Sequence, residues 1–263
     1  MSTIVITGAS RGIGRATALV LARAGHNVIA TMRNPEEIGP VAVERMDVDS
    51  GDSVRECFER IHARGPVDVL VNNAGIERGG PIEETPLADF RACMETNYFG
   101  ALRCIKSVVK PMRERRQGLI VNVTSVAGKI SASPLGPYAA TKFALEALSE
   151  ALAQEMKQFG VRVAIVEPGI IDTRMARNIE GFGTSTIYPQ VERMKKTFTD
   201  AMAAQSVPPE VVGEKILEIL ESGTWQLRHP AGPDAAPLLG WRASMTDEQW
   251  TDHYAGVGRP AEA

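Results

Sequence analysis

The chain has 263 residues, of which 44% are hydrophobic and 23% charged, and its formal net charge is −3. These values suit one large α/β domain, and the acidic balance argues against nucleic acid or an anionic membrane surface as the main partner. The three cysteines form no Cys-x-x-Cys pair and the four histidines show no metal-ligand spacing, so we expect reduced thiols, a cytoplasmic location and no metal. No apolar run approaches the roughly 20 residues that a membrane span needs, and no signal peptide is expected.

A glycine-rich turn follows the first predicted strand, Thr3–Thr7. Its glycines are Gly8, Gly12 and Gly14, and an amphipathic helix is predicted over 15–25. Glycines permit a tight turn and let the backbone approach a pyrophosphate, which the N-terminus of the helix stabilises. The order strand, glycines, helix therefore favours dinucleotide binding over a simple turn.

The end of the second predicted strand, His26–Thr31, indicates which dinucleotide is bound. NAD-binding sheets carry an acidic residue near this point, which bonds the ribose 2′-hydroxyl, and this chain has none there. Arg11 and Arg33 are instead placed where two guanidinium groups could bind a 2′-phosphate. We expect a preference for NADP(H), with NAD(H) as the alternative. Two solvated surface arginines would be the purely structural interpretation.

Two further strands are predicted over 42–50 and 67–75. The first ends in Asp47-Val48, where Asp47 is equally suited to a plain turn, and Ser50 or Asp52 can cap the next helix. The second runs into Asn72-Asn73-Ala74-Gly75, whose amides and small residues suit close approach to a ligand. We expect Asn73 to serve both the structure of the sheet and the lining of the ligand site.

The chemistry is expected where a strand over 118–125 ends in Ser125 and a long helix begins near Tyr138. Tyr138 and Lys142 are four residues apart, so they share one face of this helix. A phenol beside an ammonium group has its ionised form favoured, so we predict a lowered pKa for Tyr138. Tyr138 is then a candidate proton donor or acceptor at a substrate oxygen, with Ser125 as a second hydrogen-bonding group. The alternative is an ordinary Tyr–Lys pair on a helix surface.

The C-terminal part of the chain begins with a sixth predicted strand over 161–169, which ends in a Pro-Gly pair. The segment 174–206 mixes Gly and Thr with large apolar residues and is predicted to be a substrate-binding lid, with an ordinary helix crossover as the alternative. A helix over 208–222 and a last strand over 224–230 follow. The C-terminal extension, 231–263, is expected to be ordered at least in part, because it contains Trp241, Trp250 and Tyr254.

Strands alternating with helices predict an α/β fold. We expect a Rossmann-type doubly wound parallel sheet of seven strands in the order 3-2-1-4-5-6-7, with helices on both faces, in a single domain over 1–263. Ligands of such sheets bind beyond the carboxyl ends of the strands, at the switch point between strands 1 and 4. One or two helices are predicted over 85–112, with Asn97 in the interior. An asparagine inside a helix is locally unfavourable, and a hydrogen bond that packs this helix against a neighbour is one explanation for its presence.

Three stretches together resemble the short-chain dehydrogenase/reductase family in its compact form: Thr7-Gly8-x-x-x-Gly12-Ile13-Gly14, Asn72-Asn73-Ala74-Gly75, and Ser125 with Tyr138-x-x-x-Lys142. The resemblance implies an NADP(H)-dependent enzyme that interconverts a carbonyl and a primary or secondary alcohol. Its implied catalytic residues are Asn97, Ser125, Tyr138 and Lys142. Tyr138 exchanges the proton, Lys142 orients the nicotinamide ribose, and Asn97 holds a water that links to Lys142. The implied cofactor-binding residues are Gly8, Ser10, Arg11, Gly12, Ile13, Gly14, Arg33, Asp47, Val48, Asn73, Ala74, Gly75, Tyr138, Lys142, Pro168, Gly169, Ile170 and Thr173.

The long aromatic tail is similar to that of relatives acting on steroids, retinoids and other lipophilic molecules, which implies a lipophilic small-molecule substrate. The resemblance also implies a homodimer or homotetramer, with the long helices around Phe99 and Leu148 in contact. Two alternatives stay open at this point. One is an acyl-thioester ketoreductase of similar fold, and the other is a dinucleotide-binding sensor or scaffold without catalysis, because a fold does not fix a function.

Overall fold

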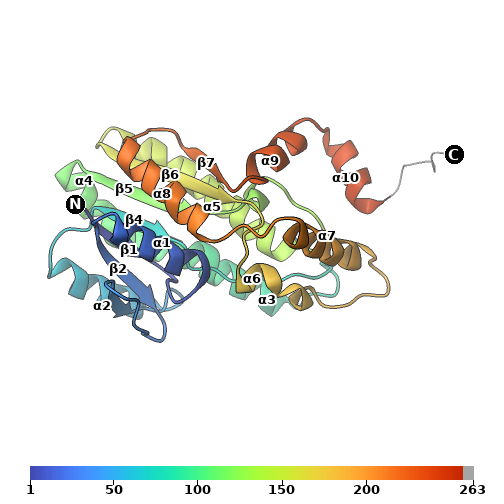
Figure 1. Ribbon diagram of the computed structural model, residues 1–263, viewed down its shortest axis with the longest axis horizontal. Coiled ribbons are helices and arrows are strands. Elements are labelled where there is room, and N and C mark those ends of the chain that lie inside the picture. The colour runs from blue at the N-terminus through green and yellow to red at the C-terminus, as the bar shows by residue number, and fades with distance from the viewer. Residues whose placement is uncertain (257–263) are drawn as a thin grey trace.

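The structure is a computed structural model. It describes residues 1–256, apart from the side chains of residues 179 and 180. Seven strands form one sheet in the order β3-β2-β1-β4-β5-β6-β7, and every neighbouring pair is parallel, so the predicted topology is confirmed (Figure 1). The strands are β1 (Thr3–Ile6), β2 (Asn27–Met32), β3 (Ala42–Arg45), β4 (Val69–Asn72), β5 (Gly118–Val123), β6 (Val161–Pro168) and β7 (Arg228–Ala231).

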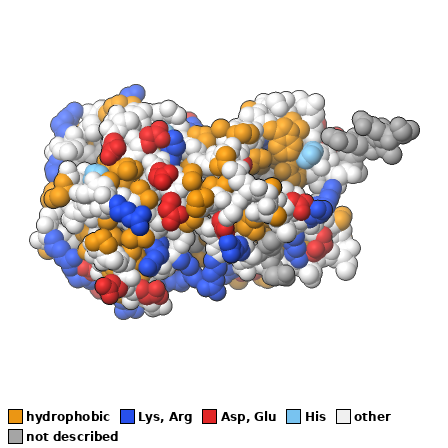
Figure 2. Space-filling view, in the orientation of Figure 1, with side chains coloured by type: hydrophobic (Ala, Val, Ile, Leu, Met, Phe, Trp, Pro, Cys, Tyr) orange, Lys and Arg blue, Asp and Glu red, His pale blue; other side chains and the backbone are white. Residues whose placement is uncertain are grey.

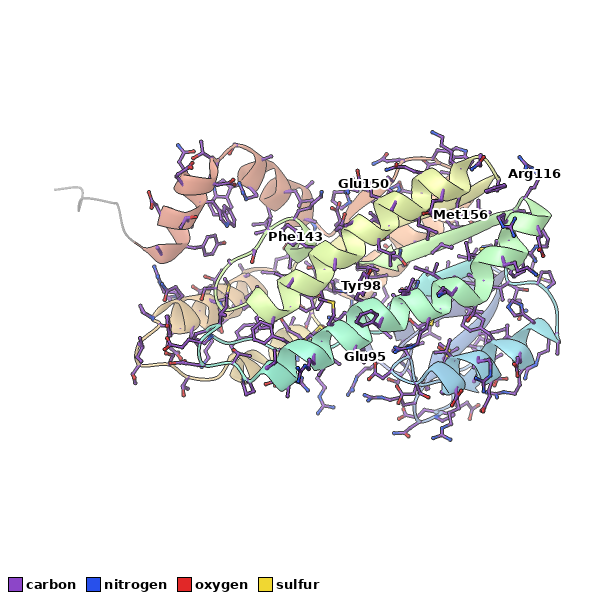
Figure 3. The ribbon with its side chains drawn as sticks, turned by 180° about the vertical axis from the view of Figure 1, so that it is seen from behind. Glu95, Tyr98, Arg116, Phe143, Glu150 and Met156 are labelled. Atoms are coloured by element: carbon purple, nitrogen blue, oxygen red, sulfur yellow. The ribbon has the colours of Figure 1, made fainter. Side chains whose placement is uncertain are left out.

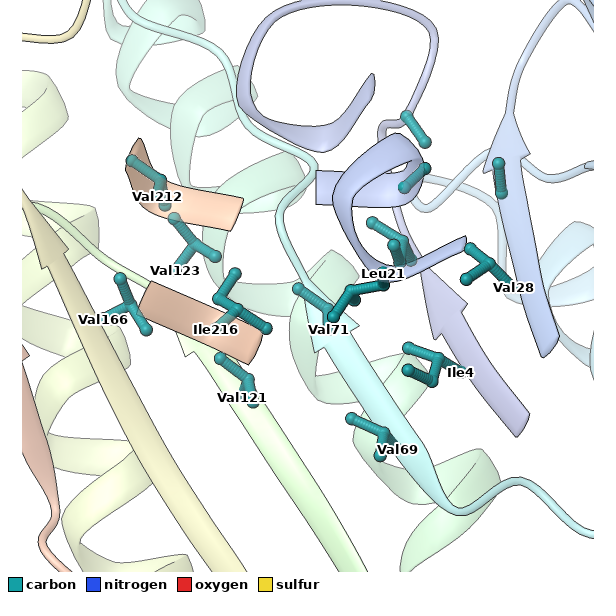
Figure 4. Close-up of a cluster of buried hydrophobic side chains, with 14 of the residues drawn as sticks. Ile4, Leu21, Val28, Val69, Val71, Val121, Val123, Val166, Val212 and Ile216 are labelled. Carbon is teal, nitrogen blue, oxygen red and sulfur yellow. The ribbon is translucent and has the colours of Figure 1, made fainter. Parts of the chain in front are cut away.

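Helices cover both faces of the sheet. One face carries α1 (Gly12–Arg23) and α8 (Glu210–Ser222), and the other carries α2 (Gly51–His62), α4 (Ala101–Arg115) and α5 (Gly136–Lys157). Successive strand residues point to opposite faces, so the central strands must be apolar on both sides. Figure 4 shows the first of the two resulting cores, where Leu21, Val212 and Ile216 pack against strand side chains such as Val71 and Val121.

The segment predicted as one or two helices is one continuous path with an irregular middle. It consists of α3 (Leu87–Met94), a π-helical turn η1 (Glu95–Gly100) and α4. The π-helical turn contains Asn97 and lies beside α5, as Figure 3 shows from behind. Such turns are rare and occur mostly at functional positions, because the extra residue changes the direction of the side chains that it carries.

The third strand is shorter than predicted, whereas the predicted cap at Ser50 is confirmed. β3 ends at Arg45, and the chain then turns, with the Asp47 carboxylate accepting a hydrogen bond from the Asp49 N–H at 3.2 Å. Ser50 caps α2 through its hydroxyl, which accepts the Ser53 N–H at 3.2 Å. Short polar side chains that bond their own backbone compete with strand pairing, and this effect outweighs the apolar pattern before them.

The segment 174–206 contains α6 (Arg174–Arg177), a 3-10 turn η3 (Ile179–Phe182) and α7 (Gln190–Ala204), which lie beyond the sheet at the end opposite the N-terminus (Figure 1). After β7, the chain forms α9 (Ala235–Ala243) and α10 (Asp247–Ala255), so the predicted extension is ordered as far as residue 256, and its last seven residues lie outside the described part. The Trp250 ring packs against Trp241 and Tyr254, at centroid distances of 5.1 and 4.7 Å. Figure 2 shows hydrophobic side chains gathered on the surface over α9 and α10.

All three cysteines are inside the folded chain. Cys57 on α2, Cys93 on α3 and Cys104 on α4 each have 0% exposure. Burial raises the pKa of their thiols to about 11, 11 and 12. A thiol with such a pKa is almost entirely protonated at neutral pH and reacts slowly with electrophiles.

Candidate active site

The carboxyl ends of the parallel strands place four loops at one edge of the sheet. The loop after β1 carries Gly8, the loop after β4 carries Asn73, β5 is followed by Ser125, and β6 by Gly169. The segment with α6 and α7 lies beyond this same edge (Figure 1). The predicted site residues therefore meet in one region, although they come from distant parts of the sequence.

The glycine-rich turn is packed directly against the loop after β4. Gly8 has φ +65°, and a Cβ atom built on it would lie 2.6 Å from the Ala74 Cα. Asn73 donates from Nδ2 to the Thr7 and Gly8 carbonyls at 2.9 and 3.2 Å, and a Cβ atom on Gly14 would clash with the same amide. Asn73 thus holds the turn in place, which is the structural half of its predicted role.

The N-terminus of α1 suits an anion. Its N-cap residue, Arg11, makes no side-chain capping bond, and no acidic residue lies in the first turn, so the positive end of the helix is not neutralised there. Ser10 lies half-buried before it, and Ile13 packs partly against the core. A Cβ atom on Gly12 would lie 3.5 Å from the Thr173 methyl group, so the loop after β6 borders this turn.

The remaining predicted cofactor residues surround this turn. Arg33 is exposed immediately after β2, whose neighbour in the sheet is β1. Val48 is buried, and its carbonyl accepts a hydrogen bond from Arg103 at 3.0 Å. A Cβ atom on Gly75 would lie 3.3 Å from the Asn97 Oδ1 atom, so Gly75 permits the approach of η1. Contact of Asp47 and Val48 with an adenine ring stays a prediction.

Asn97 uses its side chain to join two elements. Its Oδ1 atom accepts the Ile76 N–H at 2.8 Å, while Nδ2 donates to the Ile76 carbonyl and to the Thr141 hydroxyl, each at 2.9 Å. These bonds connect the loop after β4 with α5, so the helix-packing role that the sequence left open is present. A water-mediated link from Asn97 to Lys142 stays a prediction.

Ser125, Tyr138 and Lys142 converge at the end of β5. The Ser125 hydroxyl accepts the Ala127 N–H at 3.1 Å and donates to the Pro168 carbonyl at 3.5 Å, and its interaction with the phenol lowers the pKa of Tyr138. The ammonium of Lys142 donates to the Val123 carbonyl at 3.0 Å and lies 5.5 Å from the centroid of the Tyr138 ring. The fixed Tyr–Lys spacing on α5 and the position of Ser125 after β5 thus produce one cluster of three hydrogen-bonding groups.

The predicted lowering of the Tyr138 pKa is wrong for this structure. Burial raises the pKa of Tyr138, the charge of Glu77 raises it further, and the hydrogen bond from Ser125 opposes these effects only in part. Lys142 is itself buried, which lowers its pKa to about 8. Because the Lys142 ammonium is directed to the Val123 carbonyl, its charge does not offset the loss of hydration around the phenol.

Sequence comparison decides the family. A sequence model described as short chain dehydrogenase matches residues 2–182. The chain belongs to the short-chain dehydrogenase/reductase family. It is an NAD(P)-dependent oxidoreductase, consistent with interconversion of a carbonyl and an alcohol.

Named relatives and solved structures agree with this assignment. The short-chain dehydrogenase is 34% identical to bovine (Bos taurus) retinol dehydrogenase 8 over 265 residues, which covers 92% of this chain and 85% of the relative. It is 42% identical to 3-ketodihydrosphingosine reductase of Bacteroides thetaiotaomicron over 177 residues, 66% of each chain. A short-chain dehydrogenase structure from Streptomyces avermitilis matches with a TM-score of 0.83 at 32% identity, covering 95% of this chain and 96% of that one. One from Burkholderia cenocepacia in complex with NADP matches with a TM-score of 0.77 at 26% identity, covering 98% of each.

Two acidic residues of this dehydrogenase site were missed at the sequence level. Glu77 follows Gly75 by two positions; burial raises its pKa to about 7, and its charge acts on both Tyr138 and Lys142. Asp234, just before α9, accepts the Ile170 N–H at 2.8 Å. Glu77 could have been found in the sequence, because it is an acidic residue just after the Asn-Asn-Ala-Gly stretch. No neighbouring residues in the sequence indicate the role of Asp234.

The loop after β6 is held by its neighbours in the dehydrogenase fold. The Gly169 N–H donates to the Ala231 carbonyl at 3.0 Å, next to Pro168, whose carbonyl accepts from Ser125 at 3.5 Å. Thr173 caps α6 by accepting the Ala176 N–H at 3.3 Å, which is the structural alternative to a ligand contact. Its methyl group nevertheless borders the glycine turn, so both roles are compatible.

The segment 174–206 is anchored on two sides. Phe182 is buried with Val191 and Met194 and lies directly over Gly79. The Tyr188 hydroxyl donates to Glu83, in the loop after β4, while Arg193 donates to the carbonyls of residues 254 and 255 at 3.2 and 3.1 Å. The predicted lid thus joins this loop to α10.

Within residues 1–256, no helix is long and apolar enough to cross a membrane, and no three acidic, His or Cys side chains form a group that could hold a metal.

Proposed function

We propose that this protein is an NADP(H)-dependent oxidoreductase that interconverts a lipophilic carbonyl compound and its alcohol. The observation that carries the proposal is the meeting of Ser125, Tyr138 and Lys142 at the end of β5, on the edge where the glycine-rich turn also ends. A hydrogen-bonding serine, a phenol and a buried ammonium on one face of this site are the groups that proton exchange with a substrate oxygen requires.

The chain supplies the proton chemistry and the positioning. With a raised pKa, the Tyr138 hydroxyl is protonated at neutral pH and can donate to a carbonyl oxygen during reduction. Ser125, at the end of β5, would provide the second hydrogen bond that fixes this oxygen. The bound nicotinamide supplies the hydride. Lys142 would orient the ribose of the bound cofactor.

The phosphorylated cofactor is favoured by charge. Arg11 and Arg33 are both exposed after adjacent parallel strands, and the end of β2 carries no carboxylate that would repel a 2′-phosphate. The uncapped N-terminus of α1 suits a pyrophosphate. We therefore assign NADP(H) as the preferred cofactor, with Asp47, Val48, Ile170 and Thr173 bordering its ends.

A lipophilic substrate is favoured by the side chains over the site. Phe182, Val191, Met194 and Ala132 form a buried apolar cluster that contacts Leu135, three residues before Tyr138. Relatives of this chain bear the names retinol dehydrogenase and 3-ketodihydrosphingosine reductase, which fit an apolar substrate. We propose that the segment 174–206 and the extension after β7 form the apolar wall of the substrate site. The segment 174–206 is the lid over this site, and both segments belong to the same single domain.

The test is consumption of NADPH, and separately of NADH, with a panel of ketones and aldehydes of increasing chain length. Tyr138→Phe should lower turnover by about 10²- to 10⁴-fold because it removes the proton donor, while NADPH binding measured by fluorescence stays unchanged. Tyr98→Phe is the matched control, since Tyr98 lies on the outer surface of η1 (Figure 3). A Tyr138→Phe protein with wild-type turnover would overturn the mechanism.

The same panel separates the alternatives. A sensor or scaffold would bind NADPH and reduce no carbonyl. An acyl-thioester ketoreductase would reduce a β-ketoacyl thioester and leave the free long-chain ketones unchanged. Faster reaction with NADH than with NADPH would contradict the assignment of Arg11 and Arg33.

A further inference from the structure

Helix α5 carries a second buried charged residue besides Lys142. Glu146 lies one turn further along the same face of the helix, and both side chains are buried, with 3% and 5% exposure. The Thr124 hydroxyl donates to Glu146 Oε1 at 2.8 Å, and Arg228 Nε donates to Oε2 at 2.9 Å. A buried carboxylate is costly unless it is paired, so an arrangement that engages both oxygens fixes this side chain.

The partners of Glu146 are parts of the active-site wall. Thr124 stands between Val123, whose carbonyl accepts a hydrogen bond from the Lys142 ammonium, and Ser125, whose hydroxyl accepts the Ala127 N–H. The turn of α5 that joins Lys142 to Glu146 is also covered closely by Gly128, because a Cβ atom there would lie 2.9 Å from the Glu146 Cγ. Glu146 is therefore bonded to the strand end that positions both Lys142 and Ser125.

Resting on the function proposed above, we propose that Glu146, clamped between Thr124 and Arg228, is a positioning residue: it supplies the negative charge facing Lys142 and fixes the strand end on which Lys142 and Ser125 act. It touches neither substrate nor cofactor and acts through Lys142.

The charges around Lys142 support this role. Burial lowers the pKa of Lys142, and the charges that oppose burial are, in order, those of Glu146 on α5, Glu77 in the loop after β4 and Cys93 on α3. Burial holds the Cys93 thiol protonated at neutral pH, and it also raises the pKa of Glu77 to about 7. Glu146 is thus the carboxylate that contributes most to keeping the ammonium charged.

Two charged residues on neighbouring strands, Arg228 and Glu167, face Glu146. Arg228 on β7 pairs with it and also with the exposed Glu150, at 3.0 Å. Glu167 on β6 is a second buried acid, and burial, followed by the charge of Glu146, raises its pKa to about 7. The charges of Arg228 and then of Lys129, which follows Gly128, oppose this increase.

Glu146→Gln tests the inference through pH dependence. If the pKa of Lys142 falls by about one unit from its value of about 8, kcat/KM for carbonyl reduction should drop about fivefold at pH 8 and less than about twofold at pH 6. Glu150→Gln is the matched control, because it removes the exposed partner of Arg228 and leaves Glu146 paired; its pH profile should follow the wild type. Glu146→Asp, which restores the charge, should recover the alkaline activity in part.

A second readout does not depend on turnover. Titration of the side-chain nitrogen of Lys142 by NMR, in protein labelled with ¹⁵N-lysine, should show the same decrease in the Glu146→Gln protein. Identical lysine titration and an identical pH profile in wild type and Glu146→Gln would overturn the inference. If the variant does not fold, Thr124→Val removes the hydrogen bond from Thr124 to Glu146 and keeps the charge of Glu146. An unchanged KM and kcat in the Thr124→Val protein would also count against the inference. A wild type that reduces no carbonyl would instead overturn the proposed function, and the lysine titration would still decide the role of Glu146.

Discussion

Glu167 is a buried acid that is only partly satisfied. Its exposure is 2%, and among the described residues its Oε1 atom has no hydrogen-bond partner. Burial and the neighbouring Glu146 raise its pKa to about 7, from an ordinary value of 4.5. The group therefore contributes stability that is complete below about pH 4.5 and is lost as the pH rises through about 7.

Glu167→Gln should remove this pH dependence. Relative to the wild type, the free energy of unfolding of the variant should rise by about 2–3 kcal/mol between pH 4 and pH 8, because the wild type must ionise a buried carboxyl over that range. Urea unfolding at several pH values measures the difference. Glu214→Gln, at an exposed position on α8, is the control and should show a constant difference. A constant difference for Glu167→Gln as well would contradict the buried-acid interpretation.

At the level of residues, the sequence identified what has fixed spacing and missed what does not. Tyr138 and Lys142 were found because four residues along a helix define a common face. Glu77, Glu146 and Asp234 act on groups that are brought to them by the fold, from β5, β7 or the loop after β6. The pKa of Tyr138 was predicted with the wrong sign because the sequence shows a neighbouring cation but does not show how much water burial removes.

The π-helical turn η1 is an element whose irregularity has a structural purpose. It directs Asn97 at the Ile76 backbone and the Thr141 hydroxyl, so that the loop after β4 and helix α5 are joined by three hydrogen bonds. An unbroken α-helix through the same residues would carry this side chain in a different direction.

Asn97→Ala should destabilise the protein by about 2–4 kcal/mol, since it leaves the buried partners of three hydrogen bonds without a replacement. Denaturant unfolding checks the prediction. Asn27→Ala, which removes an exposed amide bonded to Thr3, should change stability by less than about 0.5 kcal/mol. A loss of activity in Asn97→Ala without a loss of stability would show that the main role of Asn97 is the predicted water-mediated link to Lys142.

The elements themselves were predicted more reliably than their ends. Every strand of the sheet was anticipated in the right order, because apolar runs between helices leave few topologies. The third strand was placed five residues too long, since apolar pattern alone does not register the turn at Asp47. The helices α9 and α10 were not recognised from sequence, because they are short and their position depends on remote contacts such as Trp250 Nε1 with the Ser131 carbonyl, at 2.8 Å.

At the scale of the whole molecule, one long surface is formed by η1, α4 and α5. Figure 3 shows Tyr98 and Phe143 on this surface, and Phe99 and Phe143 are each 42% exposed. Two large aromatic side chains left in water on neighbouring helices mark a candidate contact between copies of the chain. We propose a homodimer through this surface.

Phe143→Glu should convert such a dimer to a monomer, because each copy would bury an unpaired carboxylate at the contact. Light scattering coupled to size exclusion measures the mass. Ile187→Glu is the control, because Ile187 is 70% exposed just before α7 and belongs to none of these helices, and the mass should not change. A wild type that is monomeric at micromolar concentration would contradict the proposal, and a tetramer that becomes a dimer would place a second contact elsewhere.

The concealment of Cys57, Cys93 and Cys104 in the core makes this chain convenient for site-directed spectroscopy. Maleimide dyes attack thiolates, and in the folded protein the native sulfur atoms are both inaccessible and protonated. A cysteine introduced in place of the exposed Ile187 would therefore take up a fluorophore selectively, with no need to delete the natural thiols. The emission of that dye would follow movements of the segment around Tyr188 in real time.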